Sequence, residues 1–215
     1  MDKKAPRTLA VIEPIKVTLV NLSDDFSEEF ETPLFPKNKE LGSRKINLTK
    51  TIFIERTDFK EGDDKDFFGL TPNQPVGLKY AGIITLKEIK RDSKTGLVSE
   101  LVCEYSSETK KLKGRIHWIS QKDASRVEVR LYDYLWNVDE PMTLKEPLEE
   151  LNPHSLVIKE NSLVNKSILS GLKHLDHFQF ERLGYFVCDY DTEATTGRYV
   201  FNLTIDLGDE KNKKF

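Results

Sequence analysis

Apolar and polar side chains alternate along Phe178-Gln179-Phe180-Glu181-Arg182-Leu183-Gly184-Tyr185-Phe186. This period of two is typical of a half-buried strand with the phenylalanines on its inner face. Leu183-Gly184 breaks the alternation, which predicts a bulge or bend before a second strand. The outer face then gathers the amide of Gln179, the carboxylate of Glu181 and the guanidinium of Arg182. Such groups can read a base edge and grip a phosphate, although a core element with a surface ion pair is the simpler interpretation.

Similar strand-like runs, separated by turn signals, extend in both directions from this stretch. They cover residues 16–22, 45–48, 51–55, 82–90, 97–105, 115–119, 126–132 and 198–205. The 12 Phe and 7 Tyr residues also favour strands. Two short helices are expected, over residues 144–151 and 162–172. The pattern predicts an all-β fold, and 215 residues suit two β-barrels better than one.

The overall charge does not argue for a nucleic-acid partner. The chain carries 33 Lys and Arg residues against 36 Asp and Glu residues, a net charge of −3, so RNA binding would require a local basic face. Cys103 and Cys188 lie in apolar runs, which predicts two buried, reduced thiols, with a disulfide between them as an alternative that nothing else in the sequence supports. No apolar stretch approaches the roughly 20 residues of a membrane span, and the N-terminus has no apolar signal segment.

The sequence offers no constellation for catalysis or metal binding. Glycines are scattered singly rather than forming a phosphate-binding loop, and no Cys-x-x-Cys pair is present. His174 and His177 are the only close histidine pair, and they lack further ligands at suitable spacing. No Ser-His-Asp order indicates a nucleophile. We therefore expect no catalytic residue, no metal site and no self-sufficient enzyme.

A set of runs in fixed order resembles the C-terminal anticodon-binding region of glutaminyl-tRNA synthetases. These runs include Pro6-Arg7, Ala10-Val11-Ile12-Glu13-Pro14, Gly42-Ser43-Arg44, Thr51-Ile52-Phe53-Ile54-Glu55-Arg56-Thr57-Asp58-Phe59, Pro75-Val76-Gly77-Leu78-Lys79, Ile116-His117-Trp118-Ile119-Ser120, Val127-Glu128-Val129-Arg130-Leu131-Tyr132-Asp133, Gln179-Phe180-Glu181-Arg182-Leu183-Gly184-Tyr185-Phe186 and Val200-Phe201-Asn202-Leu203-Thr204. Each run is weak alone, but the ordered set is specific and covers nearly the whole chain.

The resemblance implies two barrels with a few short helices and the anticodon loop splayed between the barrels. The proximal barrel is expected to contain residues 10–22 and about 117–207, and the distal barrel about 23–116. Residues 1–9 are expected to be a junction, and residues 208–215 a solvated tail.

The resemblance further implies that the parent enzyme joins glutamine to its tRNA with ATP and Mg²⁺. The catalytic domain is expected to precede Met1, so this part of the enzyme binds without catalysing and needs no cofactor of its own. Its expected partners are the anticodon loop of glutamine tRNA and the catalytic domain of the same chain. A monomeric, cytoplasmic protein without membrane contact is expected.

Site residues follow from the same resemblance. The family's arginine and glutamine that read the middle anticodon base match Arg7 and Gln179, and Glu181 and Arg182 match the residues that complete that pocket. A guanidinium and an amide can together satisfy the two carbonyls and the imino group of uracil. Glu181 is expected to orient an arginine through an ion pair.

Further contacts come from loops, and here the chain departs from the bacterial pattern. Lys79 matches a basic position near the first anticodon base, and Lys37 or Asn38 falls in a loop that approaches the anticodon. Phe68-Gly69 stands where bacterial members carry a Lys-Arg pair for the third base, and Gly77 where they carry an arginine for the first. Phe68 is expected to pack in the core, or alternatively to stack on an unpaired base.

Other functions stay open at this point. The corresponding region of a glutamyl-tRNA synthetase shares the fold, although the Phe-Gln-Phe-Glu-Arg and Ala-Pro-Arg runs favour glutamine. A protein-docking domain would use the acidic segment 23–31 and the segment 144–172. An independent hydrolase has no supporting constellation.

Overall fold

The protein is described by a computed structural model, which covers residues 5–36, 38, 40, 42–62, 64–108 and 110–207. Its strands are β1 (Arg7–Thr8), β2 (Ala10–Val11), β3 (Pro14–Leu19), β4 (Ser27–Pro33), β5 (Ser43–Thr49), β6 (Thr51–Glu55), β7 (Val76–Leu78), β8 (Ile83–Arg91), β9 (Val98–Ser106), β10 (Arg115–Ile116), β11 (Trp118–Ser120), β12 (Ala124–Tyr132), β13 (Leu156–Asn165), β14 (His177–Phe180), β15 (Gly184–Cys188) and β16 (Val200–Asp206). Short 3₁₀ turns are η2 (Arg56–Asp58), η3 (Pro141–Thr143), η4 (Pro147–Glu150) and η5 (Lys166–Leu169).

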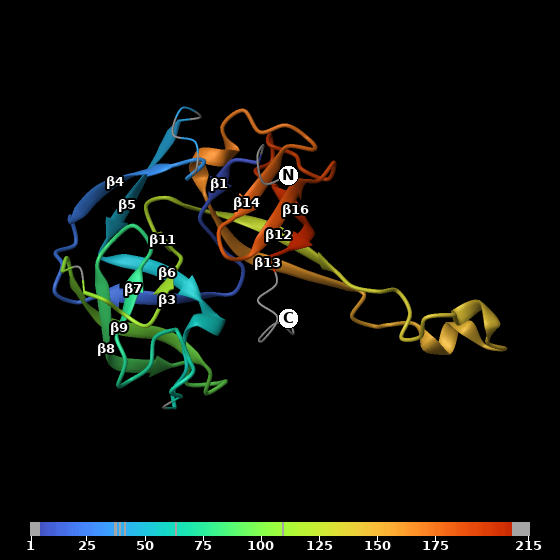
Figure 1. Ribbon diagram of the computed structural model, residues 1–215, viewed down its shortest axis with the longest axis horizontal. Coiled ribbons are helices and arrows are strands. Elements are labelled where there is room, and N and C mark those ends of the chain that lie inside the picture. Colours follow the sequence, from blue (N-terminus) through green and yellow to red (C-terminus); the bar gives the residue numbers. More distant parts are fainter. Residues whose placement is uncertain are drawn as a thin grey trace.

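Most strands belong to two seven-stranded sheets that curve into a barrel-like shape (Figure 1). Sheet A has the order β1-β14-β15-β16-β12-β13-β2, and sheet B has the order β10-β7-β8-β9-β3-β6-β11. A separate two-stranded sheet, β4-β5, lies beside them. The prediction of an all-β fold with barrel-like sheets is confirmed. Curving a sheet in this way reduces the number of exposed edges and encloses an apolar interior.

Each large sheet encloses its own apolar core. Core A contains Phe180, Phe186 and Phe201, and core B contains Ile15, Ile52 and Trp118 among others. Phe180 and Phe186 stack with their ring centroids 4.2 Å apart. Aromatic pairs of this kind add to the burial term, which is the main favourable contribution to folding.

One short segment, residues 9–12, belongs to both cores. Leu9 and Val11 pack in core B, whereas Ala10 and Ile12 pack in core A. All four side chains are at most 4% exposed. The segment is therefore apolar throughout rather than alternating, as expected for an extended chain buried on both faces.

The two expected helices are wrong. Residues 162–165 form the end of β13, where Ala124 pairs with Asn165 and Arg126 with Leu163, and only the 3₁₀ turn η5 follows. Residues 144–151 contain no more than the 3₁₀ turn η4. In residues 162–165, pairing with β12 overrides the local helical pattern. Among the described residues, no helix has the length and apolar character needed to cross a membrane.

The sheet pairing differs from the expected grouping of segments. Residues 10–22 were expected in the proximal barrel with residues 117–207, but β3 pairs with β6 and β9 in sheet B. Within the expected junction of residues 1–9, β1 is a strand of sheet A. The chain therefore crosses from sheet A to sheet B at residues 12–13, between β2 and β3.

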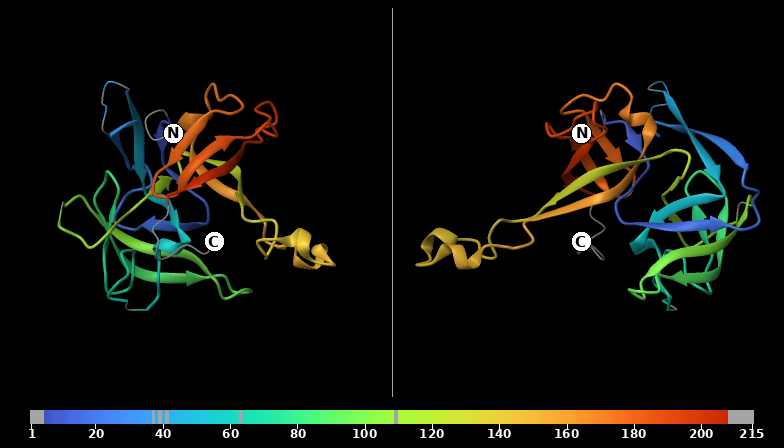
Figure 2. Two further views of the ribbon diagram at one scale, coloured as in Figure 1. Left: turned by 45° about the vertical axis from the view of Figure 1, so that its right-hand side comes forward. Right: turned by 180° about the vertical axis from the view of Figure 1, so that it is seen from behind.

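The outer parts of β12 and β13 form a two-stranded arm that extends from the body and ends in η3 and η4 (Figures 1 and 2). It presents several exposed apolar side chains: Tyr134, Leu135, Met142, Leu144 and Leu148. The acidic segment 23–31 is less loop-like than expected, because β4 begins at residue 27.

Candidate nucleic-acid interface

Arg7 and Gln179, which are far apart in sequence, are direct neighbours in sheet A. β1 pairs with β14 in parallel, with Arg7 opposite Gln179 and Thr8 opposite Phe180. The backbone N–H of Gln179 donates to the carbonyl oxygen of Pro6 at 3.0 Å. Residues opposite each other on adjacent strands project to the same face, so the guanidinium and the amide share one side of the sheet.

The amide of Gln179 is buried and incompletely hydrogen-bonded. The residue is only 7% exposed, and its Oε1 has no hydrogen-bond partner among the described residues. A buried acceptor without a partner is rare in folded proteins and carries a free-energy penalty. This atom is therefore positioned to accept a hydrogen bond from a bound group.

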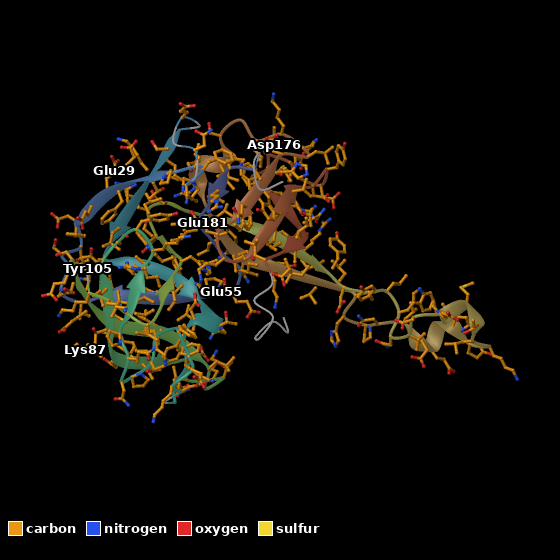
Figure 3. The ribbon with its side chains drawn as sticks, in the orientation of Figure 1. Glu29, Glu55, Lys87, Tyr105, Asp176 and Glu181 are labelled. Carbon is orange, nitrogen blue, oxygen red and sulfur yellow. The ribbon has the colours of Figure 1, made fainter. Side chains whose placement is uncertain are left out.

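Glu181 joins all three sheets. It lies in the turn after β14, where its carboxylate accepts hydrogen bonds from Arg44 of β5 and from Lys79 and Tyr80, which follow β7. The Tyr80 hydroxyl donates to the two carboxylate oxygens at 3.0 and 2.8 Å. Figure 3 places Glu181 where the strands of sheet A meet the rest of the body. The expected ion pair with an arginine is present, and its partner is Arg44.

The same arginine also fixes the backbone of Arg7. Arg44 Nη1 donates to the Arg7 carbonyl oxygen, and Arg44 Nη2 pairs with Glu181. The side chains of Arg44 and Glu181 are 4% and 1% exposed. A guanidinium has a planar fork of donors, so one side chain can hold two separate acceptors in fixed positions.

The electrostatics of this cluster favour an anionic partner. Burial opposes ionisation of Glu181, but the charges of Arg44 and Lys79 outweigh it and hold the pKa of the carboxyl below its ordinary value. Burial and then the Glu181 charge raise the pKa of Tyr80, so its hydroxyl keeps its proton. Two cations, those of Arg44 and Lys79, pair with this single carboxylate. The charge of Arg7 also acts on Tyr80, whose pKa it lowers, so the cluster carries a positive excess.

Arg182 lies apart from this cluster, so the expectation of one outer face for Gln179, Glu181 and Arg182 is wrong. Its backbone has a φ of 70°, and its guanidinium forms a bidentate pair with Asp58, with N–O distances of 2.6 and 2.7 Å. Arg182 Nη1 also lies 2.8 Å from Nδ1 of buried His117. Glu181 is itself buried at 2% exposure, because Arg44 of β5 and Lys79 and Tyr80 after β7 pack against its carboxylate.

The remaining predicted site residues lie at different depths. Lys79 is 29% exposed in its side chain, and its Nζ lies 5.3 Å from the centroid of the Tyr80 ring. Asn38 is exposed in the loop between β4 and β5. That loop starts beside Arg7, whose backbone N–H donates to the carbonyl oxygen of Leu34 at 3.0 Å. Lys37 lies outside the described residues. Phe68 is 62% exposed, so the expectation that it packs in the core is wrong.

Sequence reasoning missed Arg44 and Tyr80. A signal for Arg44 existed, because Arg44, Ile46 and Leu48 alternate along β5 and are all buried. A charged residue in phase with a core face indicates a buried ion pair. Tyr80 gave no such signal; it adopts a φ of 68° after β7, which sequence did not indicate.

The histidine pair shows ordinary structural contacts. Nε2 of His174 lies 3.1 Å from the carbonyl oxygen of Thr192, and His177 begins β14. Within the part of the chain that the structure describes, no group of three or more His, Cys, Asp or Glu side chains is arranged to hold a metal ion.

Comparison with known proteins points to one family. Two family models, both described as "tRNA synthetases class I (E and Q), anti-codon binding domain", match residues 5–106 and 115–189. A probable glutamine–tRNA ligase of Dictyostelium discoideum is 41% identical over 218 residues, which cover 99% of this chain and 27% of that protein. The glutamine–tRNA ligase of Idiomarina loihiensis is 36% identical over 97% of this chain and 38% of its own length. That of Salmonella choleraesuis is 37% identical, with the same coverage of 97% and 38%.

Proposed function

Because the chain belongs to the family of class I (E and Q) tRNA synthetase anticodon-binding domains, we propose that it binds the anticodon loop of glutamine tRNA. The observation that carries the proposal is the pairing of Arg7 with Gln179 in register. It sets a cation and a buried, unpartnered acceptor side by side on a face where positive charge is in excess. Phosphates and base carbonyls are drawn to such a face, and the free acceptor demands a donor.

The hydrogen-bonding groups of Arg7 and Gln179 favour uracil as the bound base. Uracil presents an imino donor between two carbonyl acceptors, so its N–H can reach Gln179 Oε1 while Arg7 donates to a carbonyl. A cytosine in the same position has no imino hydrogen at that ring nitrogen and would leave the buried oxygen unpaired. Loss of a single such bond typically lowers discrimination by about 1–3 kcal/mol.

Several properties of the whole enzyme are part of the proposal. The chain spans 27% to 38% of the three relatives described above, and those relatives are named as ligases of glutamine and tRNA. We infer that ATP, Mg²⁺ and the ligation reaction belong to another part of such an enzyme, with which this domain would cooperate in the cytoplasm. We also infer that this domain needs no cofactor and acts as a monomer.

The test is a binding titration with an RNA hairpin that carries the glutamine anticodon. We expect the dissociation constant to rise about 5- to 150-fold when the middle uracil is replaced by cytosine, the equivalent of 1–3 kcal/mol. In Gln179→Ala this preference is expected to disappear, whereas the matched control Gln121→Ala, an exposed amide, keeps it. Equal affinity of the unmodified protein for both hairpins would refute base reading by Arg7 and Gln179.

The glutamyl alternative needs a different hairpin. Glutamine and glutamate anticodons share the middle uracil and differ in the third base, so the middle position cannot separate them. A hairpin with the glutamate third base should bind more weakly than the glutamine hairpin. Tighter binding of the glutamate hairpin would indicate instead that the domain recognises glutamate tRNA.

The exposed apolar side chains of the arm favour a second, compatible function in protein contact. Met142 and Leu148 are 83% and 74% exposed. A group of exposed apolar side chains on one segment, unlike single scattered ones, is typical of an interaction surface. If the chain were a docking module alone, a purified protein partner would bind it while no hairpin did. Hairpin binding with a middle-base preference excludes that reading.

A further inference from the structure

His117 is a buried imidazole at a contact between sheet A and sheet B. It lies between β10 and β11 of sheet B and is 1% exposed. The other three histidines of the chain are exposed: His154, His174 and His177. Histidine is the side chain whose charge changes closest to neutral pH, so a buried imidazole can make the contact around it depend on pH.

Charged groups face both nitrogens of this ring. On one side, Nδ1 lies 2.8 Å from Nη1 of Arg182, in the turn between β14 and β15 of sheet A, and 3.8 Å from Oδ2 of Asp58 in η2. On the other side, Nε2 lies 3.5 Å from Oε2 of Glu55 at the end of β6, and it has no hydrogen-bond partner among the described residues. Two carboxylates against one guanidinium give the group an excess of negative charge, which a proton on the imidazole would offset.

Arg182 fixes the position of the proton on the neutral ring. A guanidinium donates hydrogen bonds and cannot accept them, so the contact at 2.8 Å requires His117 Nδ1 to be the acceptor. The single ring proton then lies on Nε2, toward Glu55. A second proton, on Nδ1, would set two N–H donors against each other with no acceptor between them. The contact between Arg182 and His117 therefore exists only while the imidazole is neutral.

Asp58 is the acceptor for which both cations would compete. It accepts two hydrogen bonds from Arg182, at 2.6 and 2.7 Å. Its Oδ2 is 3.8 Å from His117 Nδ1, so a small movement of the ring would bring a protonated imidazole within hydrogen-bond reach. The side chain of Arg182 is 38% exposed and can turn to water, whereas that of His117 is 2% exposed and cannot.

The backbone of Arg182 also favours its release. Its φ of 70° lies in the left-handed region, which is unfavourable for a residue with a side chain and persists only where surrounding contacts hold it. Release would loosen the two sheets without separating them, because their cores share residues 9–12. The Glu55 carboxylate would also continue to accept hydrogen bonds from the backbone N–H groups of Ile12 and Glu13, at 2.8 and 2.7 Å.

We propose that His117 forms a pH-sensitive latch between sheet A and sheet B. While the imidazole is neutral, Asp58 and His117 together hold Arg182, and the latch is closed. When a proton binds Nδ1, the imidazole takes the place of Arg182 on Asp58, and its Nε2–H faces Glu55. Arg182 and the turn that carries it are then released from sheet B. The inference is independent of the proposed function, because it concerns only the contact between the two sheets.

Nuclear magnetic resonance of the 215-residue chain, with 15N-labelled histidine and arginine, tests the latch directly. In the neutral ring of His117 we expect the proton on Nε2. As the pH falls from about 8 to about 5, the Nε–H resonance of Arg182 should shift with the same midpoint as the His117 ring. His117→Gln offers Arg182 an amide oxygen that does not titrate, so this shift should be lost. The matched control His154→Gln, at an exposed histidine just before β13, should keep it.

Three results of this titration would overturn the latch. They are a neutral His117 ring with its proton on Nδ1, a ring that takes no proton in this pH range, and an Arg182 resonance that does not follow the ring. All three can be read from the unmodified protein, so the test holds even if His117→Gln fails to fold.

Denaturation in urea tests the consequence for the contact between the sheets. Arg182→Gln should lower the urea midpoint at about pH 8, and its difference from the unmodified protein should shrink towards about pH 5, because protonated His117 has by then released Arg182. In the background of His117→Gln the difference should stay constant over the same range. A difference that stays constant with His117 present, or that shrinks equally without it, would contradict the latch.

Discussion

Glu181→Gln is the sharpest test of the cluster that joins the three sheets. The substitution keeps the shape of the side chain and removes its charge. Arg44, with a side chain 4% exposed, then keeps a buried charge without its carboxylate, whereas Lys79, 29% exposed, can turn to water. Removing one partner of a buried ion pair lowers the free energy of unfolding by about 3–5 kcal/mol. For a chain of this size the melting temperature should fall by about 6–20 °C.

Urea denaturation followed by tryptophan fluorescence measures this loss, since Trp118 lies in core B and is 1% exposed. The matched control is Glu29→Gln, which removes a carboxylate 50% exposed and paired with Lys45; it should change stability by less than about 1 kcal/mol. Adding Arg44→Met to Glu181→Gln should recover part of the loss. A loss below about 1 kcal/mol in Glu181→Gln, or strict additivity of the two substitutions, would refute the reasoning.

The same pair of proteins gives a pH signature. The pKa of Glu181 is held below its ordinary value of 4.5, although burial alone would raise it. As the pH falls, Glu181 is therefore protonated in the unfolded protein before it is protonated in the folded protein. The stabilisation by this carboxylate is complete above pH 4.5 and is lost progressively below it. The stability difference between the unmodified protein and Glu181→Gln should be constant near neutrality and shrink on acidification below pH 4.5. A difference that grew in acid would contradict the assignment.

Three further outcomes are expected. Arg182→Gln should lower the unfolding free energy by about 1–3 kcal/mol in denaturant titrations by removing the bidentate pair with Asp58; no change would mean the pair is broken in solution. Gly114→Ala should melt at a lower temperature, because its Cβ would lie 1.8 Å from a backbone oxygen, and an unchanged melt would contradict that packing. Burial raises the pKa of Cys103 to about 12 and also raises that of Cys188, so a thiol reagent at pH 8 should modify both only in urea; rapid modification of the folded protein would show that these thiols are accessible.

Local pattern was enough to find the strands around Gln179. The run from Phe178 to Phe186 contains β14 and the first part of β15, but the turn between them lies at residues 181–183, earlier than the break expected at Leu183-Gly184, and Gly184 already belongs to β15. These elements are predictable because neighbouring residues set the period and the turn. The face of Gln179 and Glu181 was misjudged, because a polar face indicates solvent only where nothing packs on it.

What sequence could not supply is the set of distant partners. Nothing local to Arg44 names Glu181 as its acceptor, and nothing local to Arg182 names Asp58. The segment 162–165 illustrates the same limit, because its apolar spacing suits a helix as well as a strand and only pairing with β12 decides between them. By contrast, the pairing of Arg7 with Gln179 was implied by family resemblance and is present in the register of sheet A.

The four residues 9–12, which divide their side chains between the two cores, have a consequence for how such a domain can change. A deletion or insertion of one residue there would exchange the inward sides of both cores simultaneously. Neither sheet with its core can therefore be exchanged independently between relatives. Because the two cores share this segment, calorimetry should record a single unfolding transition for both. During evolution, a change of length in this segment would require compensating substitutions in both cores.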